Sequence, residues 1–195
     1  MKPFRQRLND YKLTISGMSS LPEDSLKNWL DKYANKGGGF NPNYFLAGKI
    51  YTFEYRDELT EKKKFINKRP VVFFMGFNNL QNKLAFSGID LILMPPQLRL
   101  LFLERIETVY RAQIEKNVKK ILEDSNDQIA LKTDFETVNS ILSGIPFKNS
   151  YRYWNIDKIR DVKEISYEDW TKIVYLNTRS VEGTTIEEIY KKNIQ

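Results

Sequence analysis

Two stretches of the sequence combine basic and aromatic side chains, the combination that proteins use to hold nucleic acid. The first is the run EKKKFINKR, whose candidate residues are Lys62, Lys63, Lys64, Phe65, Lys68 and Arg69. The second contains the candidates Tyr151, Arg152, Trp154, Lys158 and Arg160. Basic side chains neutralise phosphates and aromatic rings stack on bases, so both stretches predict DNA binding that ignores base sequence and weakens with salt.

Both stretches also have plain structural interpretations. Lysines in a loop between strands discourage edge-to-edge aggregation. In a strand, Tyr151 and Tyr153 share one face while Arg152 and Trp154 share the other, which also fits a half-buried strand or a protein interface. The net charge of +6 favours nucleic acid or an acidic protein surface as a partner, but it equally fits ordinary solubility. The sequence leaves these alternatives open.

The residue types exclude most enzyme classes. The chain has no cysteine and no histidine, which removes Cys/His zinc sites, cysteine nucleophiles and catalytic triads. Asp57 and Glu61, next to lysines, faintly suggest a magnesium nuclease, but they fall in a loop rather than in the buried strand that such a site needs. We therefore expect a protein that is not an enzyme and that carries no metal or cofactor.

The elements that must position these residues predict an α+β fold. Strands and helices are grouped rather than alternating, which predicts a small antiparallel sheet with a long amphipathic helix and several short helices. Residues 50–56 alternate with Tyr51, Phe53 and Tyr55 on one face, so they predict a half-buried strand with a wet opposite face. Residues 70–77 are apolar on both faces, and the prolines at 95–96 open the longest helix.

Composition and the residues that start or stop helices divide the chain into four parts. We expect an extended arm at residues 1–20, a helix with a glycine joint at 21–39, an α+β core domain at 40–183 and a C-terminal helix or tail at 184–195. Phe4, Arg5 and Arg7 are candidate contacts of the arm with other chains, because an isolated arm buries too little surface to offset its ordering entropy. The sequence contains no run of about 18 apolar residues, so it predicts no membrane span.

Three blocks of the sequence point to a known family. They read GKIYTFEYRDEL followed by KRPVVFFMG, then FSGIDLILMPPQLRLLFLERI, then YRYWNIDKIRDVKEISYEDWTKIVYL. Together they resemble a family of structural proteins from the virions of tailed phages, found in myovirus-like and crAss-like phages. Some members of that family are labelled DNA end protectors. The resemblance covers roughly residues 45–180.

The resemblance implies a non-enzymatic structural subunit of a tailed-phage virion, such as a ring or connector component at the portal, neck or tail. The implied partners are other virion proteins, further copies of the chain in a homo-oligomeric ring, and DNA in non-specific contact, with no membrane. The implied location is the virion, after synthesis in the cytoplasm of the host bacterium. The alternative is a protein that binds DNA ends or lines a DNA channel, with its cations on one positive surface.

Overall fold

A computed structural model describes residues 2–16, 29, 45–56, 69–80, 82–123 and 150–176. Three predicted features lie outside the described residues: the helix and glycine joint of residues 21–39 apart from Trp29, the basic run of residues 61–68, and the tail of residues 184–195. The predicted α+β class is confirmed, because helices pack on a sheet whose strands are all antiparallel.

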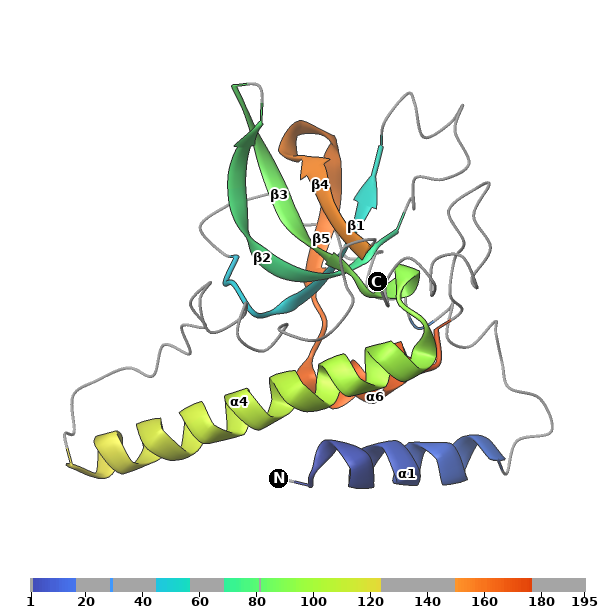
Figure 1. The fold of residues 1–195 in the computed structure, drawn as a ribbon, viewed down its shortest axis with the longest axis vertical. Coiled ribbons are helices and arrows are strands. Elements are labelled where there is room, and N and C mark those ends of the chain that lie inside the picture. The colour runs from blue at the N-terminus through green and yellow to red at the C-terminus, as the bar shows by residue number, and fades with distance from the viewer. Residues whose placement is uncertain are drawn as a thin grey trace, which may run out of the picture.

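Within the described residues, five strands form one sheet in the order β4-β3-β2-β1-β5. Their bounds are β1 Ile50–Tyr55, β2 Val71–Leu80, β3 Lys83–Asp90, β4 Tyr151–Asn155 and β5 Ile159–Glu164. The strands β4 and β5 stand at opposite ends of this order, yet only the 3-10 turn η4 (Ile156–Lys158) separates them in the chain. The sheet therefore curls until its two edges approach each other, as an incompletely closed barrel (Figure 1).

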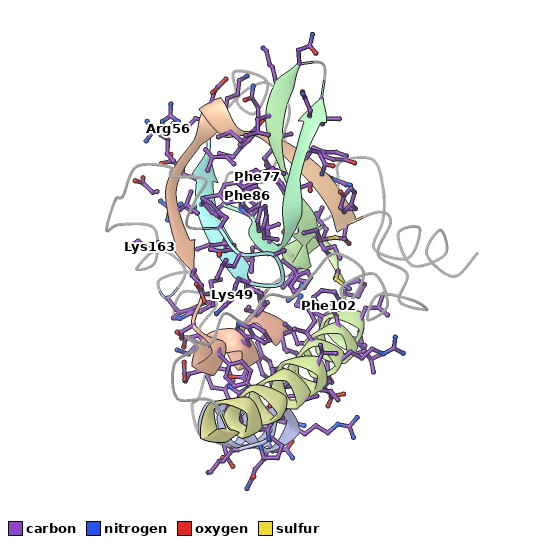
Figure 2. The ribbon with its side chains drawn as sticks, turned by 90° about the vertical axis from the view of Figure 1, so that its left-hand side faces the viewer. Lys49, Arg56, Phe77, Phe86, Phe102 and Lys163 are labelled. Carbon is purple, nitrogen blue, oxygen red and sulfur yellow. The ribbon has the colours of Figure 1, made fainter. Side chains whose placement is uncertain are left out.

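Aromatic rings fill the inner face of the curled sheet. We call this set the inner cluster: Tyr51, Phe53, Tyr55, Val72, Phe74, Phe86, Trp154 and Ile159. The predicted alternation in β1 is confirmed here, since all three of its aromatic residues point inward. Phe86 lies at the centre, stacked on Phe74 at 4.4 Å between ring centroids and edge-on to Phe53 at 5.3 Å (Figure 2).

The outer face of the sheet packs on helices. Ile50 and Phe73 on this face join Phe102, Leu103 and Ile106 of α4 (Pro96–Glu123) in a second buried cluster. The short helix α6 (Trp170–Val174) completes this cluster with its own buried residues. The wet face predicted for β1 is wrong, because Ile50 and Thr52 are buried there. The strand predicted to be apolar on both faces is confirmed for Val71–Met75 of β2, which are all buried, whereas the far end of β2 is exposed.

The expected extended conformation of residues 1–20 is wrong, because Phe4–Ser16 form helix α1. Phe4, Leu8 and Tyr11 recur at i, i+4 and i+7, so they share the face that packs on the protein. Phe4 is only 2% exposed. The basic residues between these positions concealed the helical period in the sequence. The remaining boundaries of the predicted domains stay a prediction.

The chain turns sharply between β3 and α4. The strand β3 ends at Asp90, whose Oδ1 accepts a hydrogen bond from the backbone N–H of Ile92 at 3.1 Å. This contact starts the 3-10 helix η2 (Leu91–Leu93), after which Pro96 begins α4 as predicted.

Candidate nucleic-acid interface

Basic side chains collect where β1 pairs with β5. In this antiparallel pair, Arg160 lies opposite Glu54 and Lys163 lies opposite Thr52. The backbone N–H of Arg56 donates to the carbonyl of Lys158 at 2.9 Å. Residues that are far apart in the sequence therefore carry their cations to one place on the sheet.

Arg69 reaches the same place from β2. Thr52 pairs with Val71, so Arg69 comes to the end of β1 that carries Glu54 and Arg56. We call the following set the basic edge: Arg56, Arg69, Lys158, Arg160 and Lys163. Figure 2 shows Arg56 and Lys163 along one side of the sheet, with Lys49 farther along the same side.

A β-bulge puts two of these cations on one face. Residues three apart in a regular strand point to opposite faces. The register of β5 against β1 shifts between Thr52 and Glu54, and Asp161 adopts a positive φ of 50° at that point. The extra residue brings Arg160 and Lys163 onto the same face of the sheet.

Carboxylates accompany the basic edge without cancelling its charge. Glu54 accepts two hydrogen bonds from the Arg56 guanidinium, at 2.9 and 3.0 Å, and this contact raises the pKa of Arg56. Asp157 and Asp161 are the other carboxylates of η4 and the bulge, so among the described residues five cations stand against three anions. Glu164, at the end of β5, pairs with Lys49 at 2.7 Å instead.

The basic run that was predicted to bind DNA lies, in the sequence, between two residues of the basic edge. The chain leaves the basic edge at Arg56 and returns to it at Arg69. The candidates between them are Lys62, Lys63, Lys64, Phe65 and Lys68, which lie outside the described residues and stay a prediction.

The second predicted cluster is divided by the fold. Lys158 and Arg160 join the basic edge, whereas Trp154 is 4% exposed in the inner cluster. Arg152 faces the same side as Trp154 and donates to the carbonyl of Tyr151 at 2.8 Å. Burial lowers the pKa of Arg152, although the nearby charge of Asp90 opposes this shift. Tyr151 and Tyr153 share the outer face, with their ring centroids 5.1 Å apart.

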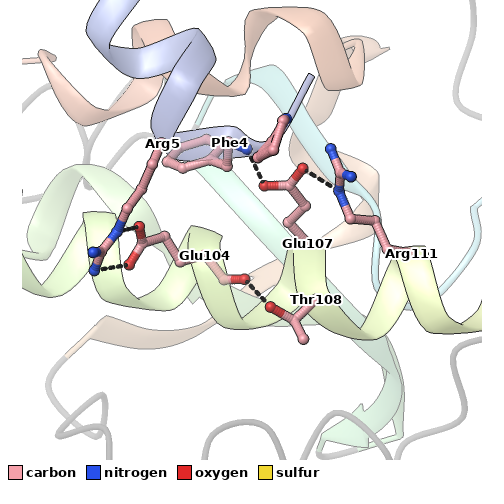
Figure 3. A pocket seen from close by; sticks show the side chains of 7 residues that line it. Phe4, Arg5, Glu104, Glu107, Thr108 and Arg111 are labelled. Carbon is pink, nitrogen blue, oxygen red and sulfur yellow. Dashed lines mark hydrogen bonds and ion pairs between the residues drawn. The ribbon is translucent and has the colours of Figure 1, made fainter. Parts of the chain in front are cut away.

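The arm candidates contact the protein's own helices rather than the basic edge. The backbone N–H of Phe4 donates to Glu107 of α4 at 2.6 Å, and the Arg5 guanidinium pairs with both carboxylate oxygens of Glu104 (Figure 3). The Arg7 guanidinium lies 4.0 Å from the centre of the Tyr167 ring.

These residues border a hollow between α1 and α4 of about 380 Å³. It is lined by Pro3, Phe4, Arg5, Glu104, Glu107, Thr108 and Arg111. Its guanidinium and carboxylate groups bind one another, so the hollow has the character of a helix contact rather than of a phosphate site.

Arg99 of α4 ties the helices to the sheet, and the sequence did not reveal it. The side chain is fully buried. Its guanidinium donates to the carbonyls of Leu91 and Met94, each at 2.7 Å. On the other side it donates to the carbonyls of Ile173 at 2.7 Å and Leu176 at 2.6 Å. No motif signals this role, because every one of these partners is a backbone carbonyl.

Among the described residues, no group of three or more acidic side chains is placed to hold a metal ion. None of the described helices is both long and apolar enough to cross a bilayer.

A comparison with protein families matches residues 2–191 to the family described as the phage T4 terminal DNA protecting protein. No curated protein matches the chain, and no solved structure matches it.

Proposed function

Because the chain belongs to the family of the phage T4 terminal DNA protecting protein, we propose that it binds the ends of linear phage DNA and shields them. Protection of this kind is a binding function, in which the protein occupies the terminus that an exonuclease needs. The lack of histidine and cysteine fits this role, since binding requires no catalytic group.

The observation that supports the proposal most is the basic edge. Arg160 and Lys163 lie on β5, and the other three cations lie within two residues of the ends of β1, β2 and β5, so the paired strands hold all five in one place. Contacts from arginine and lysine to phosphates position a protein on DNA without reading the bases. A protector of DNA termini has to bind in this sequence-independent way.

An exonuclease protection assay tests the proposal. We expect the wild-type protein to slow the digestion of a linear duplex that has free ends. Arg160→Gln combined with Lys163→Gln should reduce the slope of log affinity against log salt by about two, at roughly 0.9 per lost phosphate contact. The control, Lys2→Gln with Lys12→Gln, removes the same charge from the N-terminal residues that include α1 and should leave that slope unchanged.

Two results would contradict the proposal. One is a wild-type protein that leaves the rate of digestion unchanged at low salt. The other is a basic-edge variant that binds and protects as well as the control variant does.

The ring or connector interpretation has less support. Besides the family resemblance, it was supported by an arm that needs partner chains, but α1 packs on the helices of its own chain. We therefore propose the DNA-end role as the function, and we propose the virion, where a packaged terminus lies, as its location after synthesis in the host cytoplasm. Antibody detection of the protein in purified particles tests this location.

A further inference from the structure

The β2–β3 hairpin continues past the filled part of the barrel as a two-stranded ribbon (Figure 1). Phe77 pairs with Phe86 at the rim of the inner cluster, and three more residue pairs follow towards the turn. The last pair is Leu80 with Lys83, and Asn82 has a φ of 60° in the two-residue turn that joins them. Because a tight turn sets the register of a hairpin, the ribbon is an ordered projection.

The described residues of this tip are exposed and include no acid. We call them the hairpin tip: Asn78, Asn79, Leu80, Asn82, Lys83 and Leu84. Leu80 is 41% exposed and Leu84 is 48% exposed. Leu84 lies opposite Asn79 and Leu80 lies opposite Lys83, so each face of the ribbon presents one leucine beside one hydrogen-bond donor.

The chemistry of the hairpin tip fits the end of a DNA duplex. A two-stranded ribbon has the width that the major groove admits. Amide and ammonium groups donate hydrogen bonds to phosphates and base edges, and the absence of carboxylates avoids repulsion. Leucine side chains are among those that proteins press against base planes. A duplex exposes such a plane without prior unstacking at its terminal base pair.

We propose that the hairpin tip enters the groove at a duplex terminus and that Leu80, on the face that also carries Lys83, packs on the terminal base pair. This inference rests on the proposed function and divides it between two surfaces. The basic edge holds the phosphate backbone of any duplex, and the hairpin tip confers the preference for an end over continuous DNA.

The test compares two DNA probes in competition binding. One is a blunt linear duplex, and the other is a dumbbell of the same sequence whose two ends are closed by nucleotide loops. We expect wild-type protein to prefer the blunt duplex. Leu80→Gln should lower that preference by about tenfold, since an apolar contact with the terminal base pair is lost. Its affinity for the dumbbell and its salt dependence should stay unchanged.

A matched control is Leu101→Gln, which makes the same change at another exposed leucine, 44% exposed on α4. It should keep the preference for the blunt duplex. Leu84→Gln, on the opposite face of the same ribbon, is a second control and should also keep the preference. Thermal unfolding of every variant establishes that it is folded.

The outcomes separate the inference from the function beneath it. If wild-type protein binds neither probe, the proposed function fails and the inference fails with it. If wild-type protein prefers the blunt duplex and the folded Leu80→Gln variant keeps that preference, the hairpin-tip proposal is overturned while the DNA-end function stands. An equal loss in Leu101→Gln also overturns it, because the effect would not belong to the hairpin tip.

Discussion

The two faces of the sheet are stabilised by different chemistry. The inner face is filled almost entirely by aromatic rings that meet edge to face, with Phe86 among them. The outer face meets the helices, and there two charged side chains are buried, Arg99 at 0% and Glu107 at 4% exposure. Apolar contact is non-directional, whereas buried charges need partners at defined distances.

This difference predicts unequal tolerance to conservative substitution. On the inner face a change that keeps volume and hydrophobicity should cost little. On the helical side even a substitution of similar size should cost more, because it leaves backbone carbonyls and amides without partners in a dry environment. Four tests of this contrast follow, from the largest expected effect to the smallest.

Arg99→Met should cause the largest loss. The substitution keeps an unbranched apolar stem but removes the donors that bind carbonyls of η2 and of the end of α6. We expect the free energy of unfolding to fall by about 4 kcal/mol, because several buried acceptors lose their partner. Urea denaturation measures this change. Arg99→Lys should restore less than half of it, and a loss below about 1 kcal/mol in Arg99→Met would contradict the contrast.

Glu107→Gln should cost about 2 kcal/mol. The carboxylate accepts from the backbone N–H of Phe4 at 2.6 Å, from Arg111 at 2.8 Å and from the Tyr167 hydroxyl, and the amide retains only one acceptor oxygen. The control is Glu104→Gln, whose partner Arg5 is 77% exposed. The control should cost less than about 1 kcal/mol. Equal losses in the two variants would show that burial does not set the cost.

Phe86→Leu should cost about 1 kcal/mol, because leucine keeps most of the volume at a site bordered only by apolar contacts. The ring of Phe86 is fully buried, and other rings surround it. The measurement is the same urea titration. If this variant loses as much stability as Arg99→Lys does, the proposed contrast between the two faces is wrong.

The smallest effect concerns alkaline pH and compares one tyrosine from each side. Burial raises the pKa of Tyr51 from its usual 10.0 to about 12. Burial and a hydrogen bond to Glu107 raise the pKa of Tyr167 from 10.0 to about 12. The unfolded chain therefore ionises first, so the contribution of each tyrosine is complete below pH 10 and is lost as the pH rises to 12.

Tyr51→Phe and Tyr167→Phe should each reduce the loss of stability between pH 10 and pH 12, as followed by denaturation at several pH values. A variant whose stability declines over this range as steeply as wild type would show that its tyrosine titrates normally in the folded protein.

Periodicity in the sequence predicted the parts of the fold that depend on apolar surface. The inward alternation of β1, the covered strand β2 and the start of α4 at Pro96 were all readable, because hydrophobic spacing reports which face is buried. Helix α1 was missed, since Phe4, Leu8 and Tyr11 are separated by charged and polar residues, of which Arg5 pairs with α4 and Arg7 donates to the carbonyl of Tyr167.

The candidate site was only partly readable. The sequence identifies Arg69, Lys158 and Arg160 as basic residues but does not place them together, because their proximity depends on the pairing of β1 with β5. Arg56 and Lys163 were missed for the same reason. The alignment of Arg160 with Lys163 depends on a bulge at Asp161, and no local signal at an aspartate in a strand announces a positive φ.

The placement of β5 beside β1 has a consequence for the rate at which the chain folds. Lys49 and Glu164 form an ion pair across a separation of 115 residues, whereas β2 and β3 meet through a two-residue turn. A long loop must close, at a cost in entropy, before its stabilising contacts can form, so non-local pairing is slow. The β2–β3 hairpin is expected to form early and the docking of β5 late, which makes the assembly of the basic edge one of the last events in folding.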